Sequence, residues 1–259
     1  MTKLERRQRV MQNIDDKISK AQQAQAQSNE EPSNSHAHRR PANTPYHISE
    51  KSRVSANVHQ WIRNYSGDPS IEAFIPKLKK HIFRRYFSME EDQENHRFDN
   101  HAGYMVIKDD TLHRHAQLRV NYTSYDTRLE SDMIKPSLHP DIMIFRAHGL
   151  TKTGPYDFAR VLGIFHLEAS YLHNGNALAR RRFDLLWIRR FQYEWEDPFI
   201  ARRCPKITFS DSRDHKTFDF LDPVQVIRGL HLIPSFKDGQ CEEFSGKEWR
   251  AFYINMSVP

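Results

Sequence analysis

The stretch "YDFARVLGIFHLEASYLHNGNALARRRFDLLWIRRFQYEW", residues 156–195, decides the fold of this chain. Its first part, 156–172, is a long apolar run, which is typical of a strand that is curved or buried on both faces. The segment "HNGN" at 173–176 is a hairpin turn signal. Because the second part alternates apolar with charged residues, the stretch predicts two long antiparallel strands.

Single positions in these strands carry more specific expectations. Gly163 interrupts the first strand and predicts a bulge or a tight bend. The apolar face of the second strand consists of Phe183, Leu185, Trp187 and Phe191, and the polar face of Arg182, Asp184 and Arg190. We therefore expect Trp187 in the core. Arg189 shares that face, and we expect it near a strand end, where its charge reaches water while its stem covers apolar surface.

Shorter segments around this hairpin also favour strands. Residues 103–128 are interpreted as strands around a turn at Asp109–Asp110, and "HPDIMIFR" at 139–146 as one strand after a proline. Two more strands are "PKITFS" at 205–210 and "WRAFYINM" at 249–256. Short strands at this spacing, joined by tight turns, predict a small antiparallel barrel or sandwich.

The chain divides into three predicted parts. Residues 1–57 form a disordered basic arm with a marginal helix at 1–27, because Ser, Asn, Pro and charge dominate 28–57. Residues 58–100 form a helical lead-in followed by an acidic loop, with a helical apolar stripe from Ile71 to Ile82. Residues 101–259 form a β-rich barrel domain, so the fold class is α+β, with short N-terminal helices before the barrel.

The segment "FLDPVQVIRGLHLIPSF", Phe220–Phe236, is interpreted as the closing piece of the barrel. Asp222 is expected to bond its own backbone at a turn that Pro223 fixes. Arg228 and His231 are its other polar residues, and His231 needs a partner if the run is buried. The expected core residues of the segment are Val226, Ile227, Leu230, Leu232, Ile233 and Phe236.

Composition narrows the class of protein. The chain has 259 residues and a formal net charge of +6, which favours nucleic acid or an acidic partner. The two cysteines, Cys204 and Cys241, have no zinc-site spacing and form no disulfide framework, which points to a reducing compartment. With no secretory signal and no membrane span in the sequence, we expect a nuclear protein, with the cytoplasm as the alternative and no membrane partner.

Two clusters of basic residues are candidate nucleic-acid or partner contacts. The first consists of Lys79, Lys80, Arg84 and Arg85 at the end of the predicted helix. The second consists of Arg180, Arg181, Arg182 and Arg190 around Trp187. Arginine and lysine beside aromatic rings suit phosphates and bases. The alternative interpretation is that these residues are solvated faces of a helix and a strand.

No sequence motif assigns catalysis. P-loop, GxGxxG, HExxH and GxSxG patterns are all missing from the sequence, so no catalytic residue and no cofactor are predicted. His113 and His115 would share one face of a strand and are the metal candidates. Asp126, Asp141 and Asp184 could supply the carboxylates of a two-metal site. The competing interpretation of Asp141, in "HPD", is a turn residue that bonds the local backbone.

Seven motifs together resemble a known family. In order they are "IPKLKKHIFRR", "LRVNYTSYDTR", "HPDIMI", "ARVLGIFH", "FDLLWIRRF", "FLDPVQVIRGLHLIPSF" and "FYINM". This series, from Phe74 to Met256, is similar to an uncharacterised region of basidiomycete proteins encoded within or beside Plavaka-type elements of the CACTA transposon superfamily. Residues 158–236 also resemble the tail domain of plant CACTA transposon proteins. The strand pattern resembles BAH and SH3-like barrels in architecture alone.

The resemblance implies a mobile-element accessory or transposase-tail module without established catalytic residues. The main hypothesis is therefore a non-catalytic binding module that docks DNA, chromatin or a transposase, with an oligomeric state that the sequence does not specify. One alternative is a metal-dependent nuclease or strand-transfer remnant. Another is a truncated mobile-element product without a selected role, because members of that family continue past "YxNM" whereas this chain stops at Pro259.

Overall fold

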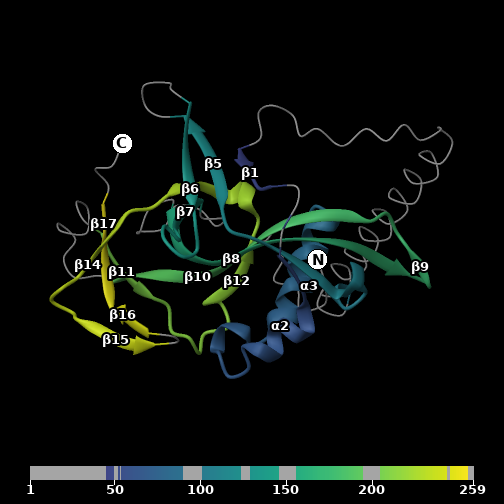
Figure 1. The fold of residues 1–259 in the computed structure, drawn as a ribbon, viewed down its shortest axis with the longest axis horizontal. Coiled ribbons are helices and arrows are strands. Elements are labelled where there is room, and N and C mark those ends of the chain that lie inside the picture. The colour runs from purple at the N-terminus through teal and green to yellow at the C-terminus, as the bar shows by residue number, and fades with distance from the viewer. Residues whose placement is uncertain are drawn as a thin grey trace, which may run out of the picture.

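The structure is a computed structural model of the chain. It describes residues 45–49, 52, 54–89, 101–123, 129–145, 156–194, 205–243 and 246–255. The predicted marginal helix at 1–27, most of the basic arm and nearly all of the acidic loop lie outside the described residues. Figure 1 shows the described elements, with two α-helices on one side of a large curved sheet.

The centre of the fold is the predicted long hairpin. β8 (Tyr156–His173) and β10 (Arg181–Glu194) pair antiparallel along most of their length, from the pair of Arg181 with Ala169 to that of Arg190 with Ala159. Asn174 and Gly175 at the turn both have positive φ, 48° and 82°. This backbone suits the Asn-Gly sequence and matches the twist of the two strands.

The expected irregularity at Gly163 is confirmed. Trp187 lies opposite Gly163 whereas Ile188 lies opposite Val161, so Leu162 is the extra residue of a bulge. The ring of Phe165 covers Gly163 so closely that an added Cβ would lie 2.5 Å from the Phe165 Cε2 atom. The glycine therefore lets the strand bend and leaves space for the Phe165 ring.

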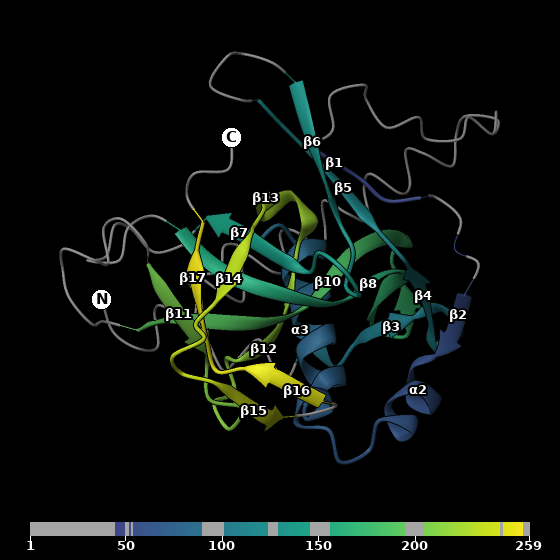
Figure 2. The ribbon, with the colours of Figure 1, turned by 60° about the vertical axis from the view of Figure 1, so that its left-hand side comes forward.

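The sheet curls because of its connectivity. Its main path runs in the order β13-β7-β8-β10-β11-β17-β14. The strands outside the central hairpin on this path are β7 (Asp141–Phe145), β11 (Lys206–Phe209), β13 (Val226–Gly229), β14 (Leu232–Pro234) and β17 (Ala251–Ile254). β13 and β14 are at opposite ends of that order, yet only Leu230 and His231 separate them in the chain. The two edges must therefore approach each other, and Figure 2 shows both near β17 and β7.

This arrangement is a curled, half-barrel sheet. The connection is held by hydrogen bonds from Leu230 N to Asp141 O, 2.8 Å, and from Asn255 N to His231 O, 3.1 Å. Mostly antiparallel strands with two α-helices among the described residues confirm the α+β class in its broad sense.

The segment around Asp109–Asp110 differs from its prediction. β3 (Met105–Ile107) and β4 (Thr111–His115) both pair antiparallel with β8, one after the other along the same edge. The short 3-10 turn η2 (Lys108–Asp110) between them therefore does not reverse the chain. Its two residues with positive φ, 52° and 45°, produce a jog in one interrupted strand rather than a hairpin.

The prediction that disorder extends to residue 57 is wrong for the part of the arm that the structure describes. β1 (Tyr46–His47) pairs with β5 (Leu118–Thr123), which also pairs with β6 (Leu129–Ile134). β2 (Val54–Asn57) pairs with β4. Polar composition did not prevent this order, because backbone ladders and the burial of Ile48 stabilise the segment.

The helical lead-in forms as predicted. α2 (Val58–Asn64) begins after Asn57, whose side chain accepts bonds from two backbone N–H groups. The 3-10 turn η1 (Pro69–Ile71) is capped by Asp68. α3 (Phe74–Tyr86) follows and tolerates Pro76 because that residue lies in its first turn. The buried face of α3 consists of Phe74, Leu78, Ile82, Phe83 and Tyr86.

Three apolar clusters lie on the two faces of the central hairpin. One lies between the helices and the parts of β8 and β10 that are nearer their connecting turn, and it includes Phe165 and Trp187. The second lies under the β1–β5–β6 sheet, around Ile164 and Ile188. The third fills the curled end, around Phe191 and Phe252. Trp187 is confirmed as a core residue.

The expected polar face of β10 is wrong, because both faces of this strand are covered. Asp184 is 3% exposed, and Leu186 and Ile188 on its side of the strand are buried. Arg189 is 4% exposed, so it does not reach water as its position near a strand end suggested. Alternation of residue types therefore indicated the strand correctly but not the burial of its faces.

The closing segment is confirmed in part. Asp222 accepts a bond from Val224 N, 3.0 Å, at the start of η3 (Pro223–Gln225), as predicted. Val226 is buried, but Ile233 is exposed on β14, the last strand of the sheet path, and Phe236, which follows β14, is 75% exposed. His231 is exposed and therefore does not need the buried partner that we expected.

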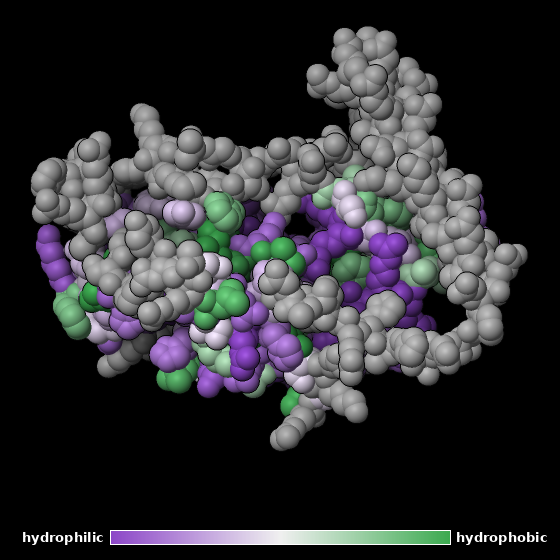
Figure 3. All heavy atoms as spheres, turned by 90° about the horizontal axis from the view of Figure 1, so that it is seen from above, coloured by the Kyte–Doolittle hydropathy of each residue, from purple (hydrophilic) through white to green (hydrophobic). Residues whose placement is uncertain are grey.

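Part of the surface can be followed in Figure 3, where the most hydrophilic residues gather in the right-hand half of the view. Hydrophobic residues elsewhere on this face form small separate areas. No helix in the described residues is long and apolar enough to cross a membrane.

We expect Gly163→Ala to destabilise the protein by about 1–3 kcal/mol, because the new methyl group overlaps the Phe165 ring. Urea unfolding of the single and double variants measures this. In a Phe165→Ala background the same glycine change should have little effect, since the overlapping atoms are gone. Equal effects in both backgrounds would show that the ring contact is not the reason for the glycine.

Candidate functional site

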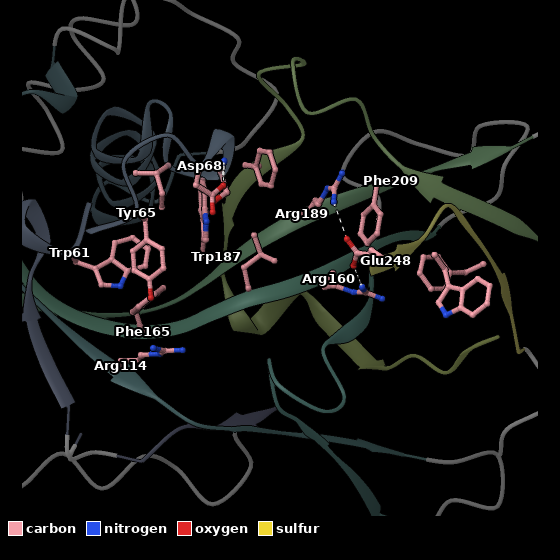
Figure 4. A pocket seen from close by; sticks show the side chains of 16 residues that line it. Trp61, Tyr65, Asp68, Arg114, Arg160, Phe165, Trp187, Arg189, Phe209 and Glu248 are labelled. Carbon is pink, nitrogen blue, oxygen red and sulfur yellow. Dashed lines mark hydrogen bonds and ion pairs between the residues drawn. The ribbon is translucent and has the colours of Figure 1, made fainter. Parts of the chain in front are cut away.

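The described surface is hollowed by a pocket of about 480 Å³ on the helix-facing side of β8 and β10. It lies between the α2–η1 segment and a hairpin formed by β15 (Gln240–Glu243) and β16 (Gly246–Trp249) (Figure 4). Eight of the 16 lining residues are aromatic: Trp61, Tyr65, Phe165, Trp187, Phe209, Phe218, Trp249 and Phe252. Such a surface suits flat, apolar chemical groups.

One end of the pocket is formed by two rings, Trp61 on α2 and Tyr65 directly after the helix. Trp61 and Tyr65 are four residues apart, so they lie on the same face of the helix, with ring centroids 5.1 Å apart. Phe165 on β8 meets Trp61 at 5.8 Å. Tyr65 is 44% exposed, so its ring is accessible from solvent. The carboxylate of Asp68, which caps η1, also lines this end.

The other end contains two arginines that the strand register places side by side. Arg160 on β8 lies directly opposite Arg189 on β10 and, on its other side, opposite Asp141 on β7. Adjacent like charges on paired strands repel each other, so this register requires anions. Asp141 supplies one, and Glu248 on β16 supplies the other (Figure 4).

The contacts of Arg160 form a closed network. Its Nε donates to Asp141 Oδ1 at 2.8 Å, its Nη2 donates to Oδ2 at 3.1 Å, and its Nη1 donates to Glu248. Burial raises the pKa of Asp141 although the Arg160 hydrogen bond and charge oppose this. Burial disfavours the charged form of Arg160 as well, but the hydrogen bonds and charges of Asp141 and Glu248 leave its pKa raised.

Arg189 stacks on an aromatic ring and also approaches Glu248. Its guanidinium carbon lies 3.9 Å from the centroid of Phe209, and its Nη1 lies 3.4 Å from Glu248 Oε2. That ion pair is longer than a strong charge-assisted hydrogen bond. The ring therefore orients a buried guanidinium toward the pocket.

The eight predicted basic residues lie elsewhere, and none of them lines this pocket. Arg85 donates to the Asp184 carbonyl at 2.6 Å and pairs with Asp222 at 2.7 Å. Lys79 donates to Gly103 O. The members of the second cluster with described contacts are Arg181 on the Tyr86 carbonyl and ring, Arg182 on Asp184, and Arg190 on Asp219.

Many of the basic side chains that were predicted to contact phosphates therefore make contacts within the protein. Lys80 also has an internal interaction. Arg84 and Arg180 complete the predicted set, and Arg180 is exposed. Arg228, a predicted signature residue, stacks on Tyr122 at 4.8 Å and approaches Asp132 at 3.6 Å.

Neighbouring arginines of α3 allow a matched test of these structural roles. We expect Arg85→Ala to destabilise the protein by about 1–3 kcal/mol, because a part-buried carboxylate and a carbonyl lose their donor. Arg84→Ala should change stability by less than about 0.5 kcal/mol. Denaturant unfolding of both variants checks this. The structural role of Arg85 is refuted if the two variants are equally stable.

The metal candidates His113 and His115 face a third histidine, His166 on β8. The His113 ring stacks on His166 at 4.5 Å, and His115 Nε2 lies 2.6 Å from His166 Nδ1. One of those two nitrogens must donate and the other must accept, so a hydrogen bond joins the two imidazole rings when both are neutral. Among the residues that the structure describes, no group of three or more His, Cys, Asp or Glu is arranged to hold a metal ion.

The charge state of this cluster is set by its surroundings. Burial, Arg182 and the other two histidines lower the pKa of His166 to about 3, although Asp184 opposes the shift. Burial and Arg182 also lower the pKa of His115. The strand register brings His113 and Asp184 close to His166, because His166 on β8 lies opposite His113 on β4 and opposite Asp184 on β10.

The lowered pKa of His166 predicts a loss of stability in acid. The unfolded chain, in which the pKa of His166 is near 6.5, binds this proton at a higher pH than the folded chain does. The contribution of neutral His166 to the free energy of unfolding is therefore fully present above pH 6.5 and is lost as the pH falls toward 3. We expect about 2 kcal/mol of loss between pH 7.5 and pH 5 from this residue. Urea unfolding at several pH values should show a smaller loss in His166→Gln; an identical pH dependence in both proteins would contradict the assignment.

The carboxylates proposed for a two-metal site do not converge in the described residues. Asp126 lies outside them. Asp141 is bonded to Arg160, whereas Asp184 accepts bonds from Tyr46 at 3.1 Å and Arg182 at 3.0 Å. The turn interpretation of Asp141 is also wrong, because its side chain pairs with an arginine of the next strand rather than with the local backbone.

No protein-family model, curated protein or solved structure matches this chain. The candidate site therefore depends on its geometry alone. Sequence reasoning missed Trp61, Tyr65, Arg160 and Glu248 as a group. Two signals in the sequence could have indicated this group: the four-residue spacing of Trp61 and Tyr65, and Arg160 as the single arginine within an apolar run. The approach of Glu248 was not, because it depends on how a distant hairpin folds over the sheet.

Proposed function

We propose that this protein is a non-catalytic binding module and that single-stranded DNA is its ligand. The observation that carries the proposal is the pocket in which eight aromatic rings accompany three arginines, Arg114, Arg160 and Arg189. Stacking on aromatic rings is sequence-tolerant because every base has a π-face, and arginine adds cation–π and phosphate contacts. The formal charge of +6 favours the same polyanion.

The accessible rings have the arrangement that such a ligand needs. Trp61 and Tyr65 lie at one end of the pocket and Glu248 at the other, and Trp249, which also lines the pocket, directly follows Glu248 on β16. Phe236, which is exposed, meets Trp249 edge-on at 5.1 Å and extends the apolar surface beyond the pocket. A flexible strand can therefore place successive bases on separate rings, whereas a rigid duplex keeps its bases stacked inside.

The wider setting of the proposal comes from the family resemblance of the sequence. A mobile-element module that docks DNA, chromatin or a transposase in the nucleus fits a basic chain with an aromatic pocket. The curled sheet is compatible with an SH3-like or BAH-like barrel, which is the finer fold assignment we propose. Fold alone does not assign a ligand, so the pocket chemistry carries the functional argument.

A second candidate ligand is a cationic side chain of a protein partner, such as a chromatin protein or a transposase. Asp68 beside Trp61 and Tyr65 favours it, because rings with a nearby carboxylate attract ammonium groups. A lysine-rich peptide that binds in place of DNA would identify this function instead.

Tyrosine substitutions provide the test of the DNA proposal. We expect Tyr65→Ala to weaken binding of a ten-nucleotide oligothymidylate by about 1–3 kcal/mol, the range for loss of one base-stacking ring. Tyr104→Ala is the matched control, because Tyr104 is similarly exposed, at 54%, but lies outside the pocket. Fluorescence anisotropy in low salt measures both variants. Equal weakening, or no binding by the unaltered protein, would overturn the proposal.

A further inference from the structure

We propose that Arg160 and Arg189 form a phosphate subsite, and that the carboxylate of Glu248 occupies this subsite in the free protein. The inference rests on the proposed function and specifies which atoms receive the backbone of the bound strand. The bound group is a phosphate of the ligand, and the group that competes with it for the two arginines is the carboxylate of Glu248.

The arginine pair is built into the sheet. Arg189 is almost fully buried on a central strand, stacked on Phe209, and lies opposite Arg160 in the ladder. Arg160 is itself surrounded by Phe209 and Phe252, with its guanidinium carbon 5.0 and 5.2 Å from their centroids. Packed rings fix both guanidinium groups, so an anion meets preorganised donors.

The two carboxylates that contact the arginine pair, those of Asp141 and Glu248, differ in how they are attached to the sheet. Asp141 is on β7, a ladder neighbour of β8, and bonds Arg160 through two parallel contacts. Glu248 is on β16, and in the described part of the chain β15 and β16 pair only with each other. Asp141 is therefore a permanent partner, whereas Glu248 can leave without disturbing the ladder of the main sheet.

Glu248 contacts the two arginines in a way that a phosphate can reproduce. The Glu248 carboxylate contacts Arg160 through Oε1 and Arg189 through Oε2, so one anion bridges two guanidinium groups. A phosphodiester also offers two anionic oxygens and suits the same pair. Exchange of one anion for another leaves no arginine unpaired, which removes the main barrier to displacing a buried ion pair.

The phosphate subsite lies in the same pocket as the rings proposed to hold the bases. Arg160, Arg189 and Glu248 line the same pocket as Trp61 and Tyr65. Figure 4 shows Trp61 and Tyr65 at one end and the arginine pair with Glu248 at the other, with Trp187 between them. A nucleotide on the rings can therefore direct its backbone toward the arginines.

The test compares two carboxylate variants of the full chain. Glu248→Gln removes the competing charge but keeps the shape of the side chain. Glu168→Gln is the matched control, because Glu168 pairs with Lys108 on the surface at 3.1 Å and lies outside the pocket. Both variants change the net charge by the same amount. The probe is a ten-nucleotide oligothymidylate, measured by fluorescence anisotropy.

We expect Glu248→Gln to bind the oligonucleotide about fivefold more tightly than the unaltered protein, because a neutral amide competes less strongly for arginine than a carboxylate does. Glu168→Gln should show a much smaller gain. An oligonucleotide with an uncharged methylphosphonate backbone should not distinguish Glu248→Gln from the unaltered protein. Equal gains in the two variants, no gain for Glu248→Gln, or the same gain with the uncharged backbone would each overturn the subsite.

Hydrogen exchange gives an independent readout. Peptides that cover residues 240–249 should exchange faster when the oligonucleotide binds, because Glu248 leaves the arginine pair. Slower exchange there would show that the hairpin stays in place and would refute the displacement. If Tyr65→Ala weakens binding while Glu248→Gln has no effect, the proposed function stands and the subsite fails. If neither the unaltered protein nor Glu248→Gln binds, both fail.

Discussion

The antiparallel pairing of β8 with β10 is the constraint on which the other elements depend. Both strands are covered on their two faces, and each contributes side chains to all three apolar clusters. The helices, the β1–β5–β6 sheet and the curled end are each positioned by a different segment of the same hairpin. The bulge at Gly163 lies at the change from one segment to the next, where the strand must bend.

The same hairpin explains the chemistry of the pocket. A central strand with both faces buried would ordinarily exclude a charge, yet β8 and β10 place Arg160 and Arg189 side by side. Rings on neighbouring strands shield the two guanidinium groups, and carboxylates from β7 and β16 compensate them. The aromatic content that the sequence shows therefore serves two purposes, because it fills the clusters and also holds the polar end of the pocket.

Local signals in the sequence predicted the local structure. The Asn-Gly turn, the bulge at Gly163 and the cap at Asp222 each depend on neighbouring residues, and all three formed as expected. The burial of Asp184 and Arg189 could not be read in this way, since it depends on layers from distant parts of the chain. The predicted basic clusters show the same limit, because charge counts do not reveal that Arg85 has two internal acceptors. The pocket combines residues from α2, β8, β10 and β16, which no single periodicity connects.

The two-residue connection between β13 and β14 has a consequence for how the protein behaves among its own copies. Open sheet edges present unpaired backbone groups that recruit strands of other molecules. Here Leu230 and His231 bring the two ends of the main sheet path together, and backbone bonds at Asp141 and Asn255 fix that meeting point. At this seam the Leu230 N–H, the Asp141 carbonyl, the His231 carbonyl and the Asn255 N–H are therefore paired within the chain, and these four backbone groups are not available to a strand of another molecule.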